Sequence, residues 1–245
     1  MKVLVIPDVH LKPWMFERAA ELMKEGIADQ AVCLMDIPDD WRQQFNLDLY
    51  VSTFDAAISF AKEFPKTLWC YGNHDVCYPW NQRESGYSHV APRTVCEKLQ
   101  ELREVLPDEK QLAFRHRIDD VIFCHGGLTE EYVRHYIPAE QYDDVDAVVD
   151  TINGFGLGEL WQDASPLWYR PQYYDGKMYK SEELLQVVGH TPVEAIIKKD
   201  NYISCDVFST YQDGRPIGTQ EYLLLDTGSW EYEGVRGRRA GKIRS

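Results

Sequence analysis

Short apolar runs alternate with amphipathic segments through the first half of the chain, and this alternation constrains the possible fold most strongly. Three of the runs are typical of strands buried on both faces, at residues 2–6, 30–35 and 67–71. The segments after them repeat apolar residues at helical spacing, at 14–25, 47–64 and 93–105. This order of strands and helices predicts an α/β fold with a mostly parallel sheet.

The second half of the chain is richer in strands. We expect strands at 112–118 and 121–125 to form a hairpin around Asp119-Asp120, a helix at 142–152, and strands at 185–189, 202–205 and 221–226. The aromatic, glycine-rich and proline-rich segment from about 154 to 180 is expected to form a cap or long loop. We expect one domain over 1–233 and a basic tail over 234–245, which carries Arg236, Arg238, Arg239, Lys242 and Arg244.

The charge balance and the cysteines limit the partners and the compartment. With 26 basic and 40 acidic residues the net charge is −14, so we do not expect extended binding to nucleic acid. No run approaches the roughly 18 apolar residues of a membrane span, so we expect no membrane partner. The first apolar run is broken by Pro7 and Asp8 and does not resemble a signal peptide. None of the six cysteines forms a C-x-x-C pair, which favours a reducing, cytoplasmic location.

Most of the polar residues that stand out come directly after apolar strands. The carboxyl ends of parallel strands meet in one crevice, which is where ligands bind in such folds. Side chains that are far apart in the sequence can therefore meet there, namely Asp8, His10, Asp36, Asn73, His125 and His190.

These six residues are suited to hold divalent metal ions. They offer carboxylate and amide oxygens and imidazole nitrogens without a thiolate, a mixture that favours manganese, iron or zinc. Asp8 and His10 are two residues apart, so on an extended segment their side chains point the same way. One carboxylate between two ions, with ligands on both sides, gives a two-metal clamp for a phosphoryl group.

Each short motif is weak alone, but the set in this order resembles the calcineurin-like metallophosphoesterase superfamily. Two further segments resemble the phosphoprotein-phosphatase branch of this superfamily, and within that branch they are most similar to bacterial Ser/Thr phosphatases and symmetrical dinucleoside tetraphosphatases. Asp226-Thr227-Gly228 resembles the last-strand motif of the same branch. The superfamily motifs are Asp8-Val9-His10, Asp36, Gly72-Asn73-His74-Asp75, His125-Gly126-Gly127-Leu128 and Gly189-His190-Thr191-Pro192; the branch segments are Phe123-Cys124-His125-Gly126-Gly127-Leu128 and Leu167-Trp168-Tyr169-Arg170-Pro171.

The resemblance implies a four-layer α-β-β-α sandwich with two metal ions at the strand ends. By the same resemblance, Asp8 and His10 bind the first ion, Asp36 bridges both, and Asn73, His125 and His190 complete the second. His74 then protonates the leaving oxygen and is oriented by Asp39, while Arg170 binds the phosphoryl oxygens as a planar fork. The implied reaction is direct attack on phosphorus by a hydroxide that bridges the metal ions.

The second motif departs from the family pattern. The family has Gly-Asp-x-x-Asp-Arg-Gly, whereas this chain has Met35-Asp36-Ile37-Pro38-Asp39-Asp40-Trp41. A carboxylate at Asp40, in place of the phosphate-binding arginine, would repel a phosphate group. Either Arg42 or Arg83 takes over that role, or the substrate is not a phosphoprotein.

Three functions therefore remain open. The leading one is hydrolysis of phosphomonoesters on proteins or small molecules, and the alternative is hydrolysis of nucleotides such as dinucleoside polyphosphates or phosphodiesters. A catalytically silent scaffold is disfavoured, since every metal-ligand position is filled. The aromatic residues of the cap either stack a nucleobase or simply pack together, and packing is favoured: Trp161, Trp168, Tyr169, Tyr173 and Tyr174.

Overall fold

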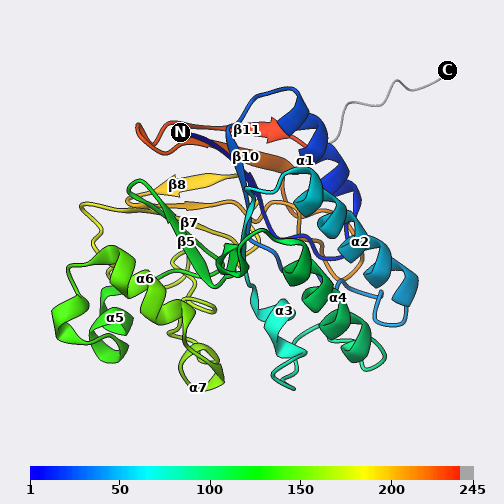
Figure 1. The fold of residues 1–245 in the computed structure, drawn as a ribbon, viewed down its shortest axis with the longest axis horizontal. Coiled ribbons are helices and arrows are strands. Elements are labelled where there is room, and N and C mark those ends of the chain that lie inside the picture. Colours follow the sequence, from blue (N-terminus) through cyan, green and yellow to red (C-terminus); the bar gives the residue numbers. More distant parts are fainter. Residues whose placement is uncertain (238–245) are drawn as a thin grey trace.

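Two β-sheets pack face to face in the computed structural model, which describes residues 1–237 (Figure 1). The first sheet has the order β11-β10-β1-β2-β3-β4, and the second has the order β5-β6-β7-β9-β8. The strands of the first sheet are β1 (Lys2–Ile6), β2 (Gln30–Cys33), β3 (Leu68–Cys70), β4 (Leu112–Ala113), β10 (Glu221–Asp226) and β11 (Tyr232–Arg236). Those of the second are β5 (Arg115–Ile118), β6 (Val121–Cys124), β7 (Leu185–Val188), β8 (Ile197–Lys199) and β9 (Tyr202–Ser204).

Helices cover the outer face of each sheet, as Figure 1 shows. The first sheet is covered by α1 (Trp14–Lys24), α2 (Leu47–Glu63) and α4 (Pro92–Val105), and the second by α5 (Glu130–Tyr136) and α6 (Val145–Asn153). Two short helices, α3 (Asn73–Cys77) and α7 (Leu157–Leu160), lie in the connections. The predicted α/β class and four-layer order are confirmed.

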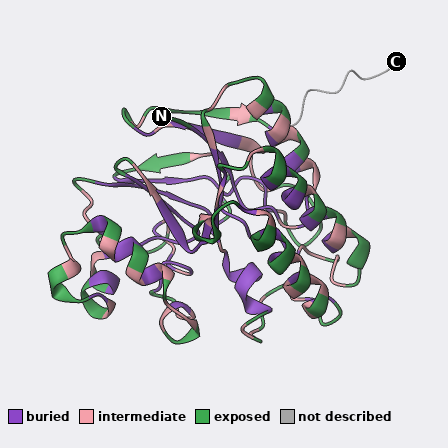
Figure 2. Ribbon diagram, viewed as in Figure 1, coloured by how far each residue is buried: buried purple, intermediate pink, exposed green. Residues whose placement is uncertain are grey.

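The side chains of β1 alternate between two apolar clusters, one on each face of the first sheet, and both faces are therefore buried. Val3 and Val5 belong to the apolar cluster between the two sheets, which also includes Phe123 and Val187 of the second sheet. Leu4 and its neighbours on the other face belong to the cluster beneath α1, α2 and α4. Since successive side chains of a strand point to opposite faces, an unbroken apolar run is what a central strand requires. The central strands are accordingly buried in Figure 2, whereas β8 and β11 are largely exposed.

The predicted strand at 112–118 is two strands in two different sheets. β4 pairs in parallel with β3, while β5 pairs with β6 across the predicted hairpin, where Ile118 lies opposite Val121. The chain changes sheet at Phe114, which is 9% exposed and leaves no polarity signal in the sequence. Five short elements were also not predicted: α3, α5, α7, β8 and β11.

The basic tail predicted at residues 234–245 includes three residues that belong to a strand. Gly234, Val235 and Arg236 belong to β11 and pair with Leu223, Tyr222 and Glu221 of β10. One face of this edge strand is open to water, so its sequence contains a glycine and charged residues in place of an apolar run. For this reason the strand was not predicted from the sequence. The remaining predicted tail residues, Arg238, Arg239, Lys242 and Arg244, lie outside the described residues.

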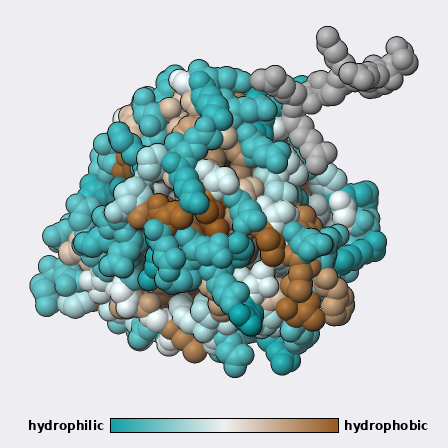
Figure 3. Space-filling model, turned by 45° about the vertical axis from the view of Figure 1, so that its right-hand side comes forward, coloured by the Kyte–Doolittle hydropathy of each residue, from teal (hydrophilic) through white to brown (hydrophobic). Residues whose placement is uncertain are grey.

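The surface agrees with the composition. The face shown in Figure 3 is largely hydrophilic, with apolar residues confined to small patches. All six cysteines are free thiols. Among residues 1–237, no helix is both long enough and apolar enough to cross a membrane.

Candidate metal centre

The six predicted ligands meet at the carboxyl ends of strands from both sheets. Three strands of the first sheet lead into them: β1 into Asp8 and His10, β2 into Asp36, and β3 into Asn73 at the start of α3. In the second sheet, β6 leads into His125 and β7 into His190. Five of the six residues are buried, and His10 has 17% of its side chain exposed.

Five of these ligands fall into two groups that share one carboxylate. In the first group, Asp8, His10 and Asp36 each offer a ligand atom within 4.8 Å of the others. In the second group, Asp36, His125 and His190 do the same. Asn73 adjoins the second group, since its Oδ1 lies 2.9 Å from His125 Nε2. Asp36 is thus placed to contact two ions at once.

The second group brings together more lone pairs than protons. His125 Nδ1 lies 3.2 Å from the Leu34 carbonyl oxygen, which makes Nδ1 the protonated nitrogen and leaves Nε2 as an acceptor. Around Nε2 lie Asn73 Oδ1 at 2.9 Å, His190 Nδ1 at 3.1 Å and Asp36 Oδ2 at 3.2 Å. A cation satisfies four converging acceptors, whereas a single proton cannot, so these residues fit a metal ion.

Two buried atoms of the cluster also lack a partner within residues 1–237. Asp8 Oδ1 and His190 Nε2 have no hydrogen bond there, although buried polar atoms normally have one. Burial, with Asp206 and Asp36 nearby, raises the pKa of Asp8. Burial also acts to raise the pKa of Asp36, but the neighbouring histidines His125 and His74 outweigh it and hold the pKa below its ordinary value.

Close backbone contacts fix the positions of the two carboxylates. The His190 amide donates to Asp8 Oδ2 at 2.8 Å, and the His74 amide donates to Asp36 Oδ1 at 2.9 Å. His10, Asp36 and His190 have φ angles of 42°, 39° and 61°, which non-glycine residues rarely adopt outside functional sites. The ligand loops are therefore held by specific contacts and not by local preference.

Gly189→Ala is expected to empty the first ion position. A Cβ atom at Gly189 would lie 2.0 Å from Asp8 Oδ1, so the carboxylate would have to move. We expect the variant to lose at least one ion per chain and about 10²-fold in kcat, because a small misplacement near the reacting groups is costly. This prediction is checked by measuring the metal content with inductively coupled plasma spectrometry and by measuring kcat. Gly158→Ala is the control, since its Cβ would meet nothing within 4 Å; equal metal content in both variants would contradict the assignment.

His74 and Asp39 form a hydrogen-bonded pair at the edge of the cluster. His74 Nδ1 lies 2.9 Å from Asp39 Oδ2, while the Tyr50 and Tyr78 hydroxyls donate to Asp39 Oδ1 at 2.7 and 2.5 Å. Burial acts to lower the pKa of His74, but the carboxylates of Asp36 and Asp39 outweigh it and raise the pKa to about 9. The ring belongs to neither ligand group, and in its charged form it can donate a proton.

Four of the six candidate ligands line a cavity of about 170 Å³, and Arg170 lines it as well; the four are His10, Asp36, Asn73 and His190. The Arg170 Nη1 donates to the His190 carbonyl at 3.0 Å and to the Thr191 hydroxyl at 3.2 Å, which leaves its other nitrogen atoms free for a substrate. Trp41 and Trp168 line the same cavity. Trp168 packs edge-on against His190 with ring centroids 5.3 Å apart, which shows that part of the aromatic cap packs.

The carboxylate at Asp40 is paired. It lines the cavity, accepts a hydrogen bond from Lys12 Nζ at 3.2 Å, and accepts another from the Thr210 hydroxyl at 2.6 Å. Lys12 is buried and Asp40 is partly buried, and the charge of Lys12 offsets that of Asp40. Neither Arg42 nor Arg83 lines the cavity, so neither replaces the missing arginine in this structure.

Sequence reasoning missed the roles of two buried carboxylates. Asp75 accepts from the amides of Asp36, Ile37 and Gly72 at 2.9 to 3.0 Å and so ties two ligand loops together. Burial and the Asp36 charge raise its pKa to about 7. Asp206 follows β9 and lines the cavity, a position at a strand end that could have drawn attention to it.

The motif Asp226-Thr227-Gly228, which resembles the family's last-strand motif, does not lie at the metal site. Asp226-Thr227-Gly228 lies in the turn between β10 and β11, where Asp226 Oδ1 accepts from the amides of Gly228 and Ser229 at 2.9 and 3.1 Å. It is not among the residues lining the metal-site cavity.

Solved structures share this fold at low sequence identity. A cold-active protein-tyrosine phosphatase of a psychrophilic Shewanella species is 17% identical, with a TM-score of 0.57 over 96% of this chain and 80% of that one. A point mutant of a cold-active protein tyrosine phosphatase gives a TM-score of 0.58, with the same identity and coverage. No curated protein sequence matches the chain.

The family is shown by a match over most of the chain. The calcineurin-like phosphoesterase model matches residues 1–214, which include every candidate ligand together with His74, Asp39 and Arg170. The match confirms the resemblance seen in the motifs and agrees with two acceptor groups suited to divalent ions. This chain belongs to the calcineurin-like phosphoesterases and is a metal-dependent hydrolase of phosphoester bonds.

Proposed function

We propose that the protein hydrolyses phosphomonoesters, on proteins or small molecules, by direct transfer of the phosphoryl group to water. The observation that carries this proposal is the arrangement of two acceptor groups sharing Asp36, the His74–Asp39 pair and Arg170 around one small cavity. We assign the two ion positions to manganese, because the mixed carboxylate, amide and imidazole ligands suit it. A cytoplasmic location is supported by the six unpaired thiols.

The side chains divide the reaction between them. Two divalent ions bound to these ligands would supply positive charge and lower the pKa of a water molecule held there. Arg170, held by the His190 carbonyl, presents its free nitrogen atoms to the phosphoryl oxygens and stabilises the charge that develops on them. His74, held by Asp39, donates a proton to the leaving oxygen. Trp41 and Trp168 narrow the cavity and limit the entry of water.

The Lys12–Asp40 pair favours a monoester over a diester. An unpaired carboxylate at the cavity wall would disfavour a phosphate dianion, but Lys12 Nζ lies 3.2 Å from Asp40 Oδ2 and cancels much of its field. With Asp40 offset in this way, two bound ions and Arg170 would supply the positive charge that a dianion needs. A nucleotide-directed hydrolase is the second candidate, supported by Trp41 and Trp168, whose rings could stack a base at the cavity.

The test compares p-nitrophenyl phosphate with bis-p-nitrophenyl phosphate as substrates at saturating Mn²⁺. We expect kcat/KM for the monoester to exceed that for the diester by at least about tenfold, equivalent to roughly 1.4 kcal/mol of transition-state stabilisation. Lys12→Met should reduce this preference, because it leaves the Asp40 carboxylate uncompensated. A faster diester reaction in the wild-type protein would overturn the monoesterase proposal and favour the nucleotide alternative.

A further inference from the structure

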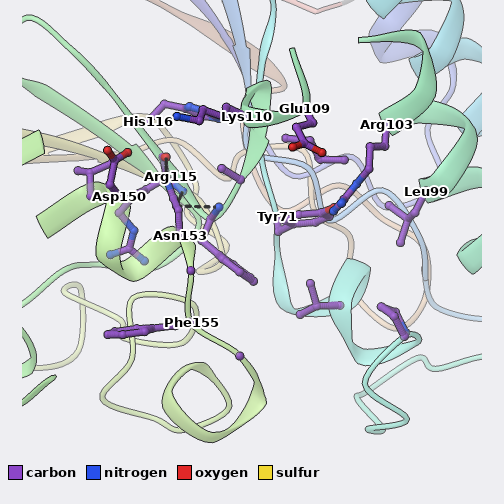
Figure 4. A pocket seen from close by; sticks show the side chains of 18 of the residues that line it. Tyr71, Leu99, Arg103, Glu109, Lys110, Arg115, His116, Asp150, Asn153 and Phe155 are labelled. Carbon is purple, nitrogen blue, oxygen red and sulfur yellow. Dashed lines mark hydrogen bonds between the residues drawn. The ribbon is translucent and has the colours of Figure 1, made fainter. Parts of the chain in front are cut away.

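A groove of about 1000 Å³ lies apart from the metal centre, between α4 and α6 (Figure 4). The junction of β4 and β5 crosses it, and residues on both sides face inward. Helix α3 separates the two sites: Asn73 and His74 line the cavity at the metal centre, whereas Val76 lines the groove. The proposed catalytic residues do not line the groove, so the function proposed above leaves it unexplained.

The groove has an aromatic wall of three stacked or tilted rings. Trp80 stacks on Phe114 with ring centroids 5.8 Å apart, and Tyr71 contacts Phe114 from the other side at 5.4 Å. Phe155 adds a fourth ring on the opposite side, as Figure 4 shows. The groove thus combines an aromatic wall with charged and polar residues, and a concave surface that offers both kinds of contact can bind a small molecule.

Arg115 is the unusual member of the lining. It is fully buried, and none of its three guanidinium nitrogens has a hydrogen-bond partner among residues 1–237. It lies opposite Cys124 in the β5–β6 ladder, which directs it toward the α6 side of the sheet. Burial lowers the pKa of Arg115 to about 10. An unpaired guanidinium in an apolar interior is destabilising, so its presence calls for an anionic partner.

Two of the other cations that line the groove are already engaged, while a third, Lys110, is exposed to solvent. Arg117, two residues along the same strand, forms ion pairs with Asp120 and Asp146, both at 3.1 Å. Arg103 donates to the Tyr71 hydroxyl at 3.1 Å. Arg115 is held only through its backbone, where Asn153 bonds both its N–H and its C=O at 3.0 Å. Its long side chain therefore breaks no hydrogen bond when it turns toward a ligand.

We propose that this groove binds a small organic carboxylate with an aromatic body, whose carboxylate pairs with Arg115 and whose ring packs on Trp80 and Phe114. A monoanion suits the site better than phosphate, because a dianion loses more hydration on entering the groove and is repelled more strongly by Glu109, Asp146 and Asp150, which also line it. The planar guanidinium of Arg115 matches a carboxylate with two parallel hydrogen bonds. The chain carries a net charge of −14, so such a site depends on local cations and not on the overall field.

The test is calorimetric titration of the intact, Mn²⁺-loaded protein with 2-naphthoate and with its uncharged isostere 2-naphthamide. Saturating inorganic phosphate is present throughout to occupy the metal centre. We expect wild-type protein to bind the acid at least about tenfold more tightly than the amide, since a hydrogen-bonded charge pair adds that much. Arg115→Met should abolish this difference, and its melting temperature should rise by about 3 °C as the unpaired charge is removed.

Two variants keep the result interpretable. Arg117→Met removes a charge from the same strand and should leave naphthoate binding within about twofold, because Arg117 is already paired. Gly156→Leu adds bulk to the groove lining without a clash, since a Cβ there meets nothing within 4 Å, and it should block both probes even if Arg115→Met does not fold. The proposal is overturned if wild-type protein does not bind naphthoate, if acid and amide bind equally, or if Gly156→Leu binds normally.

Discussion

Asp36→Asn is expected to lower kcat by at least about 10³-fold and to reduce the metal content below two ions per chain. Asp36 is the only residue common to both acceptor groups among the described residues, so one substitution weakens both positions. The loss corresponds to about 4 kcal/mol, the scale of the charge stabilisation that bound metal ions supply. The fold should survive, because the Asn Oδ1 can still accept from the His74 amide.

Metal analysis together with kcat on p-nitrophenyl phosphate tests this result. Asp40→Asn is the matched control, since Asp40 lines the same cavity but lies outside both acceptor groups. That variant should keep two ions per chain. Unchanged activity and metal content in Asp36→Asn would refute the two-metal assignment.

His74→Asn is expected to lower kcat by about 10² to 10⁴-fold while both ions stay bound. The imidazole belongs to neither acceptor group, and its contact with Asp39 Oδ2 is that of a proton donor held in position. The loss should depend on the leaving group, because a poor leaving group needs the proton and p-nitrophenolate needs it much less. An alkyl phosphate should therefore show a much larger decrease than p-nitrophenyl phosphate.

The measurement is kcat for the two substrates, combined with metal content. His116→Asn is a useful control: His116 is a buried histidine whose Nε2 lies 3.1 Å from the Trp69 carbonyl, and it does not line the metal-site cavity. Equal losses for both substrates, or loss of an ion, would mean that His74 acts on metal binding and not on the leaving group.

The placement of the candidate ligands could be predicted from the sequence because strand ends are visible in it. Runs such as Val3-Leu4-Val5-Ile6 are apolar throughout, and the polar residues after them are conspicuous. A parallel sheet then brings the strand ends together without any knowledge of loop geometry. The same logic applied to β9 points to Asp206, which the sequence analysis did not name.

Features that depend on contacts between distant parts of the chain could not be predicted from the sequence. The switch between sheets at Phe114 depends on packing against two neighbours that are distant in sequence, β3 and β6. The pairing of Lys12 with Asp40 and Thr210 likewise joins residues 28 and 170 positions apart, so the sequence showed only an unfavourable carboxylate. The short helix α3 has five residues, too few for a periodic pattern to be recognised.

The ligands come from both sheets, and this has a consequence for how the protein denatures. Asp8, His10 and Asp36 follow strands of the first sheet, whereas His125 and His190 follow strands of the second. Ions bound between them would link two layers that otherwise meet through apolar contacts, a few hydrogen bonds and the loops that join them. Chelation should then loosen the sandwich as a whole, and free ion at a hundredfold excess over Kd should add about 2.7 kcal/mol to the free energy of unfolding.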